Sequence, residues 1–301
     1  MPLRTVGGRE LYVQGRMVRI ARLEGDKYKF VDAPEELIAD LRKSRERIDI
    51  FTFMQKLPEK QPRYRYPMEL DNLAALPIST YDHWWTKQLN NKTRNMVRKA
   101  EKKGVTLREV PFDDALIRAI WGICNECPVR QGKPFRHYGM DLEAVRKCAE
   151  TFLDSSIFIG AFSEDTMIGF LKLTMDDTRT QAGLMHILSM VRHRDKAPTN
   201  ALIAQAVRSC ADRGIPYLVY SNFAYGKKQK DSLSEFKERH GFQRMVLPRY
   251  YVPLTAVGRA ALRLGLHHRF VERIPEPVLA KLRELRNSWY HRKLQTATEA
   301  S

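Results

Sequence analysis

The stretch from Val105 to Leu254 constrains the fold most, because its apolar periodicity predicts a fixed succession of elements. The order is strand, helix, helix, strand, strand, strand, helix, strand, helix, strand. The predicted strands are 106–110, 156–162, 167–175, 181–191, 217–223 and 243–253, and the predicted helices are 114–127, 141–152, 201–213 and 232–240. Few folds have this order, which indicates an α/β (α+β) protein with a mixed central sheet flanked by helices.

Local patterns support these elements. On the helix 114–127, Leu116, Ile120 and Ile123 recur at three- and four-residue spacing, as a helix with one buried face requires. The two β-rich runs between 156 and 175 are separated by a short polar turn, which predicts a hairpin.

A basic loop precedes the third predicted helix of this stretch. Residues 192–200 bring Arg192, Arg194 and Lys196 to the start of a helix that ends before Gly214. Backbone N–H groups at a helix start are unpaired, and the helix dipole is positive there. The junction therefore suits a phosphate or a pyrophosphate.

Three further segments have the form of known motifs. They are Lys92-Thr-Arg-Asn-Met-Val-Arg-Lys-Ala-Glu-Lys-Lys-Gly104, Gln131-Gly-Lys-Pro-Phe135 and Ser232-Leu-Ser-Glu-Phe-Lys-Glu-Arg-His-Gly-Phe242. They resemble the basic helix before the catalytic lobe, the segment between the first two helices of that lobe, and the late helix of Fem-type aminoacyl transferases in the GNAT acyltransferase superfamily. The resemblance covers residues 81–253, about half of the chain, and implies a GNAT-type mixed sheet.

The resemblance leaves the donor open. The phosphate loop of the superfamily normally carries glycines that close around the coenzyme A pyrophosphate, but residues 192–200 contain none. Fem-type members tolerate this loss, because their donor is an aminoacyl-tRNA. We expect no tightly bound cofactor, and either acyl-CoA or aminoacyl-tRNA as the donor substrate. The residues expected to contact the donor are Arg192, Arg194, Lys196, Thr199, Asn200 and Asn222.

The resemblance also implies catalytic residues. The lysine of the Phe-Lys pair, Lys237, is expected near the donor carbonyl, where its charge would stabilise the developing oxyanion. His186 on the strand 181–191 is the candidate base, and Tyr225 the candidate acid for the leaving group. The alternatives are an exposed helix lysine, a core histidine and a packing tyrosine. The expected geometry is one cleft bordered by all three and the loop 192–200, where the strands 181–191 and 217–223 part.

Two groups of cations are candidates for binding substrates. Arg130, Lys133, Arg136 and His137 form a cationic loop between the first two helices, which covers the acceptor in this fold. Arg94 and Arg98 belong to a ridge on a predicted helix 82–103, where cations gather along one side. A phosphate track for tRNA would have this pattern, and so would the solvated face of an ordinary surface helix.

The charge of the chain indicates a polyanionic partner. Fifty-two Lys and Arg residues oppose 35 Asp and Glu residues, which gives a net charge of +17 and a pI of about 9.8. The candidates are tRNA, a nucleotide-linked substrate, coenzyme A and an anionic membrane surface, and charge does not choose among them.

The predicted organisation has four parts. Residues 1–80 form a smaller degenerate N-terminal lobe, 81–103 a basic linking helix, 104–253 the acyltransferase lobe, and 254–301 a basic helical C-terminal extension. In the first part we expect a hairpin of residues 11–23 and 27–31 around Glu24-Gly-Asp, a helix over 34–43 and a strand over 48–53.

The C-terminal extension contains a predicted amphipathic helix that begins at Pro277. Such a helix binds an anionic bilayer or docks its apolar stripe on the protein. The chain has no run of 18 apolar residues and its N-terminus no apolar signal segment, so we expect a soluble, cytoplasmic protein.

Cysteine and histidine usage predicts no metal site. The four cysteines at 124, 127, 148 and 210 lie on or near apolar helical faces, and the Cys-x-x-Cys pair has no second pair to complete a zinc site. The eight histidines form no ligand pattern in the sequence. Free, packed thiols in a reducing compartment are expected.

The sequence therefore predicts a Fem-like GNAT acyltransferase that forms an amide from an activated donor and an amine acceptor. An ordinary acyl-CoA-dependent N-acetyltransferase is the alternative within this class. A non-catalytic protein that binds RNA or a membrane surface is the alternative outside it.

Overall fold

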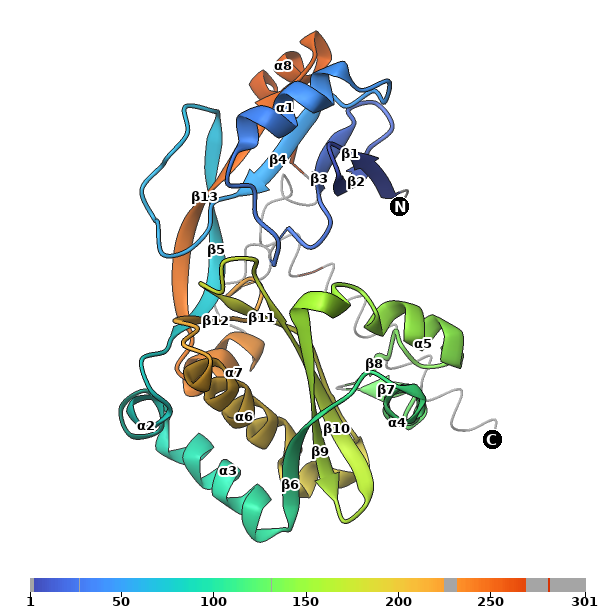
Figure 1. Ribbon diagram of the computed structural model, residues 1–301, viewed down its shortest axis with the longest axis vertical. Coiled ribbons are helices and arrows are strands. Elements are labelled where there is room, and N and C mark those ends of the chain that lie inside the picture. Colours follow the sequence, from blue (N-terminus) through green and yellow to red (C-terminus); the bar gives the residue numbers. More distant parts are fainter. Residues whose placement is uncertain (1–2, 27, 131, 225–231, 269–280, 282–301) are drawn as a thin grey trace. The chain divides into compact units, whose positions relative to one another are not determined.

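The computed structural model describes residues 3–26, 28–130, 132–224, 232–268 and 281. The fold is mixed α/β, with a large, mostly antiparallel central sheet flanked by helices (Figure 1). The chain forms two compact units from discontinuous segments. Unit 1 comprises residues 1–79, 175–183 and 210–269, and unit 2 comprises 80–174, 184–209 and 270–301.

The strands of unit 1 follow a spatial order that differs from the chain order. The order is β1 (Leu3–Val6), β2 (Arg9–Gln14), β3 (Ile20–Leu23), β4 (Ile50–Met54), β13 (Gln243–Pro253), β5 (Met68–Pro77) and β12 (Tyr217–Val219). These pairs are antiparallel except β3 with β4. The helices are α1 (Pro34–Lys43), α7 (Ser232–Arg239) and α8 (Ala256–Arg263).

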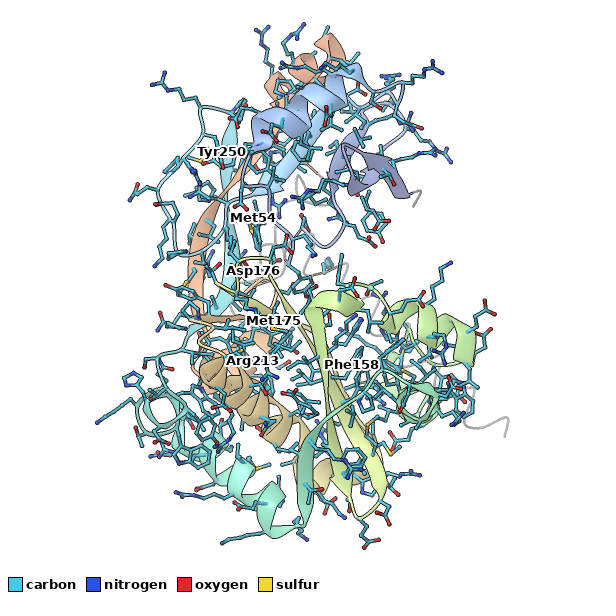
Figure 2. The ribbon with its side chains drawn as sticks, in the orientation of Figure 1. Met54, Phe158, Met175, Asp176, Arg213 and Tyr250 are labelled. Carbon is cyan, nitrogen blue, oxygen red and sulfur yellow. The ribbon has the colours of Figure 1, made fainter. Side chains whose placement is uncertain are left out.

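The alternation of side chains along β4 explains how helices cover both faces of its sheet. Phe51 and Phe53 share one face and pack with Leu37 of α1. Ile50 points to the opposite face and packs with Ala261 of α8. On β13, labelled Tyr250 packs its ring 5.1 Å from that of Phe53 (Figure 2).

Unit 2 contains much of the segment 81–253 that resembles acyltransferases, and the rest of that segment belongs to unit 1. Its strand order is β11 (Ala182–Ser189), β10 (Thr166–Met175), β9 (Ser156–Ser163) and β6 (Val105–Val110), with a separate ribbon of β7 (Val129–Arg130) and β8 (Lys133–Pro134). The helices are α2 (Tyr81–His83), the π-helix η1 (Trp84–Gln88), α3 (Asn91–Lys102), α4 (Asp114–Asn125), α5 (Leu142–Ala149), and the 3₁₀ helices η2 (Leu153–Ser155) and η3 (Val191–Lys196). Helix α6 (Pro198–Asp212) and strands β10 and β11 each continue into unit 1 at one end.

Helices α4 and α5 cover one side of β9 and β10, and α6 lies on the other side (Figure 1). Ile120 and Ile123 of α4 and Val145 of α5 pack with Phe158 and Phe170 of these strands. Figure 2 shows Phe158 on the side that α4 and α5 occupy. This apolar layer fixes the positions of both helices relative to the sheet.

All ten elements predicted between 105 and 254 are present, and β13 has the predicted bounds. Two strands are shorter than predicted. β11 spans Ala182–Ser189 and not 181–191. β12 ends at Val219 and not at 223, because Ser221 has a left-handed φ of 52° that a strand does not accommodate.

The predicted continuous helix 82–103 is wrong. The chain leaves the π-helix at Leu89, whose ψ is 128°, and α3 starts afresh after Asn90, which caps the N–H of Lys92 with its side chain. Arg94 closes this break by donating to the carbonyls of Trp85 at 2.8 Å and Leu89 at 3.1 Å.

The predicted N-terminal hairpin is also wrong. Strands β2 and β3 pair directly, so the chain reverses at Gly15 and not around Glu24-Gly-Asp. Gly15 has a φ of +97°, and a Cβ there would lie 1.9 Å from the carbonyl oxygen of Val18. No strand forms over residues 28–31, whereas the unpredicted strand β5 begins with polar residues that concealed its pattern.

The predicted helix from Pro277 lies outside the described residues, apart from the exposed Lys281. Among the described residues, no helix is both long and apolar enough to cross a membrane.

Lys172 is a fully buried cation in the middle of β10. Its Nζ donates to the carbonyl oxygen of Ala149 at 2.7 Å and to that of Thr151. These carbonyls lie at and just beyond the C-terminus of α5, where the helix dipole favours a positive charge. Burial lowers the pKa of Lys172 to about 8. The lysine therefore ties α5 to the sheet.

We expect Lys172→Met to lower the free energy of unfolding by about 2–3 kcal/mol, because it keeps the apolar stem and leaves buried carbonyls without their charged donor. Urea unfolding measures the change. The matched control is Lys147→Met on the exposed side of α5, which should stay within about 0.5 kcal/mol of the unaltered protein. Equal stability of the two variants would contradict the capping role.

Candidate functional site

The loop after β11 holds a carboxylate of the chain itself. The backbone N–H groups of Val191 and Arg192, at the start of η3, donate to the two carboxylate oxygens of Glu126 at 2.6 and 2.9 Å. Glu126 directly follows α4, and only 10% of its side chain is exposed. Its carboxylate also lies 3.9 Å from Nε of Arg192. This is the loop at which the sequence predicts a phosphate.

Arg130 supports this carboxylate from a second side. Its Nη2 lies 3.7 Å from Glu126 and donates to the carbonyl of Ile123 at 2.7 Å, while its Nη1 donates to the carbonyl of Ser189 at 2.8 Å. The guanidinium stacks 4.3 Å from the ring centre of Phe135. Arg130 thereby joins α4, β11 and the loop before α5, which is a positioning role within unit 2.

The start of α6 offers few amides to a ligand. Pro198, its first residue, has no N–H, and the N–H of Asn200 donates to the carbonyl of Ala197 at 3.1 Å. Ala197 itself has a left-handed φ of 53°. The Thr199 hydroxyl is 3.0 Å from the Ser189 hydroxyl. The backbone N–H groups between β11 and the first turn of α6 are called the amide cradle here, and those of Val191, Arg192 and Asn200 are already bonded within the protein.

The predicted donor-binding cations fall in one segment of unit 2. The side chain of Arg192 is 63% exposed, Arg194 is exposed, and Lys196 donates to the Ser163 hydroxyl at 2.6 Å. Asn222 lies in unit 1, where its side chain donates to Asp71 at 3.3 Å. Donor contact by any of these residues, or by Thr199 and Asn200, stays a prediction.

His186 on β11 borders a small apolar cavity between the sheet and helices α4 and α5. The volume of this cavity that the centre of a water molecule can reach is about 20 Å³, which is enough for one ordered water. Its lining residues are Ile120, Cys124, His137, Met140, Val145, Cys148, Ala149, Phe170, His186 and Leu188.

Burial disfavours the charged forms of three titratable side chains that line this cavity. Burial, and then the nearby charge of Lys172, lower the pKa of His186 to about 4, and its buried Nε2 has no hydrogen-bond partner among the described residues. Burial also lowers the pKa of His137 and raises that of the Cys124 thiol to about 11. Lys133 and Arg136 are exposed beside this region.

A pKa of about 4 limits what His186 can do as a base. Taking a proton from an α-ammonium with a pKa near 8 would cost about 5 kcal/mol, since each unit is about 1.4 kcal/mol. A neutral Nε2 is suited to forming a hydrogen bond with an amine or an ordered water. The catalytic role of His186 stays a prediction.

Lys237 on α7 is fully buried, so the alternative of an exposed helix lysine is wrong. Its Nζ donates to the carbonyl of Asn222 at 2.5 Å and lies 4.7 Å from the ring centre of Tyr220. A cation in such a low-dielectric environment exerts a strong field on nearby charge. Tyr225 lies outside the described residues. Lys237 and His186 belong to different units, so their common cleft stays a prediction.

The two strands that were predicted to part are paired over a short stretch, and their divergence stays a prediction. β11 and β12 pair in parallel only at Ala182 with Leu218 and at Gly183 with Val219. β11 continues to Ser189, whereas β12 ends after the second pair.

The basic ridge lies on the second half of α3. Arg98, Lys99, Lys102 and Lys103 line a surface depression with Asn95. Arg94 differs from them, because its guanidinium donates to the carbonyls of Trp85 and Leu89 at the helix break. The ridge presents several cations to solvent, while contact of Arg94 or Arg98 with a substrate stays a prediction.

Sequence reasoning missed two features of this structure. The first is the role of Glu126, which in the sequence is only a residue between two cysteines. Its hydrogen-bond partners come from a loop about 65 residues further along the chain. The second feature is a group of side chains that includes two of the histidines, whose spacing in the sequence predicts no metal site. Glu69, His267 and His268 bring three potential ligand atoms within 4.8 Å of one another. The two histidines are adjacent, but Glu69 lies 198 residues before His267, which is why the sequence spacing did not indicate the group.

Comparison with solved structures identifies the fold. The chain is similar to the C-terminal domain of a putative lysylphosphatidylglycerol synthetase from Agrobacterium fabrum, with 12% identity, 86% of each chain covered and a TM-score of 0.57. It is similar to FemX, with 10% identity, 80% of this chain and 83% of that chain covered, and a TM-score of 0.56. L-PGS from Bacillus licheniformis matches with 14% identity, 86% of each chain covered and a TM-score of 0.54.

No protein-family model and no curated protein sequence matches the chain. The similarities above show that the chain has a GNAT/Fem-like acyltransferase fold. At these identities they show the fold alone.

The buried neutral state of His186 predicts a specific pH dependence. Its pKa is about 4 in the folded chain and near the ordinary 6.5 when unfolded, so unfolding takes up a proton between these values and acid lowers stability. From pH 8 to pH 5 this effect amounts to about 2 kcal/mol. We expect His186→Leu to remove about 1–2 kcal/mol of the acid loss measured by urea unfolding. An unchanged acid loss would show that His186 is not buried as a neutral ring.

Proposed function

We propose that this chain is an acyltransferase that forms an amide, moving an aminoacyl group from an ester-linked RNA donor, an aminoacyl-tRNA, to an amine acceptor. The GNAT/Fem-like fold supports acyl transfer as the reaction class. The names of similar structures, FemX and lysylphosphatidylglycerol synthetase, support an aminoacyl donor for this fold type, although the latter name denotes a lysylated lipid as the product.

The observation that carries the choice of donor is the Glu126 carboxylate in the amide cradle after β11. We infer that a coenzyme A pyrophosphate would use the N–H groups that Glu126 occupies at 2.6 and 2.9 Å, because they lie in the loop before α6. Displacing the carboxylate loses two charge-assisted hydrogen bonds, each worth about 1.5–3 kcal/mol. The loss of about 3–6 kcal/mol would weaken coenzyme A binding by two to four orders of magnitude. An RNA-borne ester does not need this cradle.

The basic ridge on α3 supports RNA as the carrier of the acyl group. Arg98, Lys99, Lys102 and Lys103 gather around one depression, and the whole chain has a net charge of +17. Phosphate contacts of this kind position a nucleic acid and make its affinity salt-dependent.

In the proposed reaction the acceptor nitrogen attacks the ester carbonyl of the donor. A C–N bond forms, the C–O bond to the ribose breaks, and the proton lost by the amine balances the proton gained by the leaving hydroxyl. Lys237 would stabilise the negative charge on the carbonyl oxygen. His186 would hold the amine or a water by a hydrogen bond, and Tyr225 would protonate the leaving oxygen.

A mass-spectrometric donor screen tests the function. The full chain is incubated with charged tRNAs or with a pool of acyl-CoAs, together with amine acceptors, and the consumed donor and the amide product are identified. Consumption of a charged tRNA supports the proposal. Exclusive consumption of an acyl-CoA would contradict the donor, and salt-dependent RNA binding without turnover of any donor would contradict the enzyme.

Removing the internal carboxylate should open the cradle. We expect Glu126→Ala to gain coenzyme A binding, seen as a rise in melting temperature with millimolar coenzyme A that the unaltered protein lacks. Glu143→Ala, at an exposed position of α5, is the matched control and should show no rise. Tight binding of coenzyme A by the unaltered chain would contradict the account of Glu126.

Lys237 should matter for turnover more than for donor affinity. We expect Lys237→Met to lower kcat at least about 100-fold with a small change in KM, as for loss of one oxyanion-stabilising donor. Arg239→Ala, a half-exposed position on the same helix, is the control and should keep normal turnover. Far-ultraviolet circular dichroism confirms that each variant is folded. Full turnover by folded Lys237→Met would show that the site lies elsewhere.

A further inference from the structure

A group of three potential metal ligands lies in unit 1. Oε1 of Glu69 is 2.9 Å from Nε2 of His267 and 3.1 Å from Nε2 of His268. All three ligand atoms lie within 4.8 Å of one another. Two imidazole nitrogens and one carboxylate oxygen are a frequent donor set for zinc in proteins.

The spacing fits a single ion. Bonds of about 2.0–2.2 Å from zinc to nitrogen and oxygen place two ligands of a tetrahedron about 3.3 Å apart. The observed distances of 2.9 and 3.1 Å from the carboxylate to the two rings are within a few tenths of an ångström of this value. A small outward movement of Glu69, whose side chain is 41% exposed, would admit the ion.

The two ligand-bearing segments are fixed by the backbone. Glu69 lies in β5, opposite Arg249 of β13 in the antiparallel register. The histidines follow the end of α8, where Gly265 has a φ of +63° and the N–H of Leu266 donates to the carbonyl of Ala261 at 2.8 Å. This arrangement returns the chain toward β5 and lowers the entropy cost of assembling the ligands.

Packing holds the inner histidine in place. The ring of Tyr251 meets the ring of His267 edge-on at 4.7 Å, and the side chain of His267 is 8% exposed. Nδ1 of His267 is buried and has no partner among the described residues, whereas its Nε2 donates to Oε1 of Glu69 at 2.9 Å. A metal ion bound at Nε2 would replace this proton, and the ring would then carry its proton on Nδ1.

The nearest arginine does not compete for the carboxylate. Arg249, across the register from Glu69, pairs with Asp26 at 2.9 Å and with Asp71 at 3.0 Å. Within the described part of the chain, the ion pairs of Glu69 are those with the two histidines.

We propose that Glu69, His267 and His268 bind one divalent transition-metal ion of the Zn²⁺ class and thereby clip the chain after α8 to strand β5. Imidazole ligands favour Zn²⁺, Co²⁺ and Ni²⁺ over Ca²⁺ and Mg²⁺, which prefer oxygen. Three protein ligands leave a fourth position for water. The proposal is independent of the transferase function.

Calorimetric titration of the chelator-treated full chain with ZnCl₂ tests this site. We expect one equivalent to bind, a visible ligand-field spectrum with Co²⁺, and a rise in melting temperature with Zn²⁺. Glu69→Gln, His267→Gln and His268→Gln should each weaken the affinity at least about tenfold. His83→Gln, at an exposed position, is the matched control and should leave the affinity unchanged.

Melting temperatures measured without metal show whether each variant is folded. The absence of stoichiometric binding would show that the three residues form a hydrogen-bonded trio only and would overturn the proposal. Binding that all three folded variants retain at full affinity would overturn it as well.

Discussion

The carboxylate of Glu126, held by the amides of Val191 and Arg192, is the interaction on which this account depends. A loop before a helix that exposes backbone N–H groups attracts an anion, because these groups donate hydrogen bonds and the helix dipole is positive there. Here the chain supplies the anion itself, from the end of α4. Arg130 then joins the same carboxylate to α4 and β11, so that one carboxylate fills the loop and also connects elements of unit 2.

Two buried lysines show how differently one residue type is used in this fold. Lys172 donates to carbonyls at the end of α5 and serves packing, because its partners lie within the helix layer of unit 2. Lys237 meets the carbonyl of Asn222 just beyond the end of β12, the strand that is predicted to part from β11. The position of a buried cation relative to the strands that are predicted to part, and not burial itself, makes Lys237 the candidate for catalysis.

Much of the fold between 105 and 254 could be predicted from the sequence, because hydrophobic periodicity depends on local spacing. The break at Leu89 could not, since it depends on the cap of Asn90 and on the contacts of Arg94. Less of the candidate site could be predicted from the sequence. Lys237 was named through a motif, but its burial required the tertiary fold, and Glu126 gave no local signal because its partners come from another element.

The most direct test of the central claim is to follow the backbone amide resonances of Val191 and Arg192 by nuclear magnetic resonance during a titration with coenzyme A. The account predicts that both resonances stay in place, because their N–H groups remain bonded to Glu126. Saturable shifts of these two amides at micromolar coenzyme A would contradict it, since the cradle would then be open to the pyrophosphate.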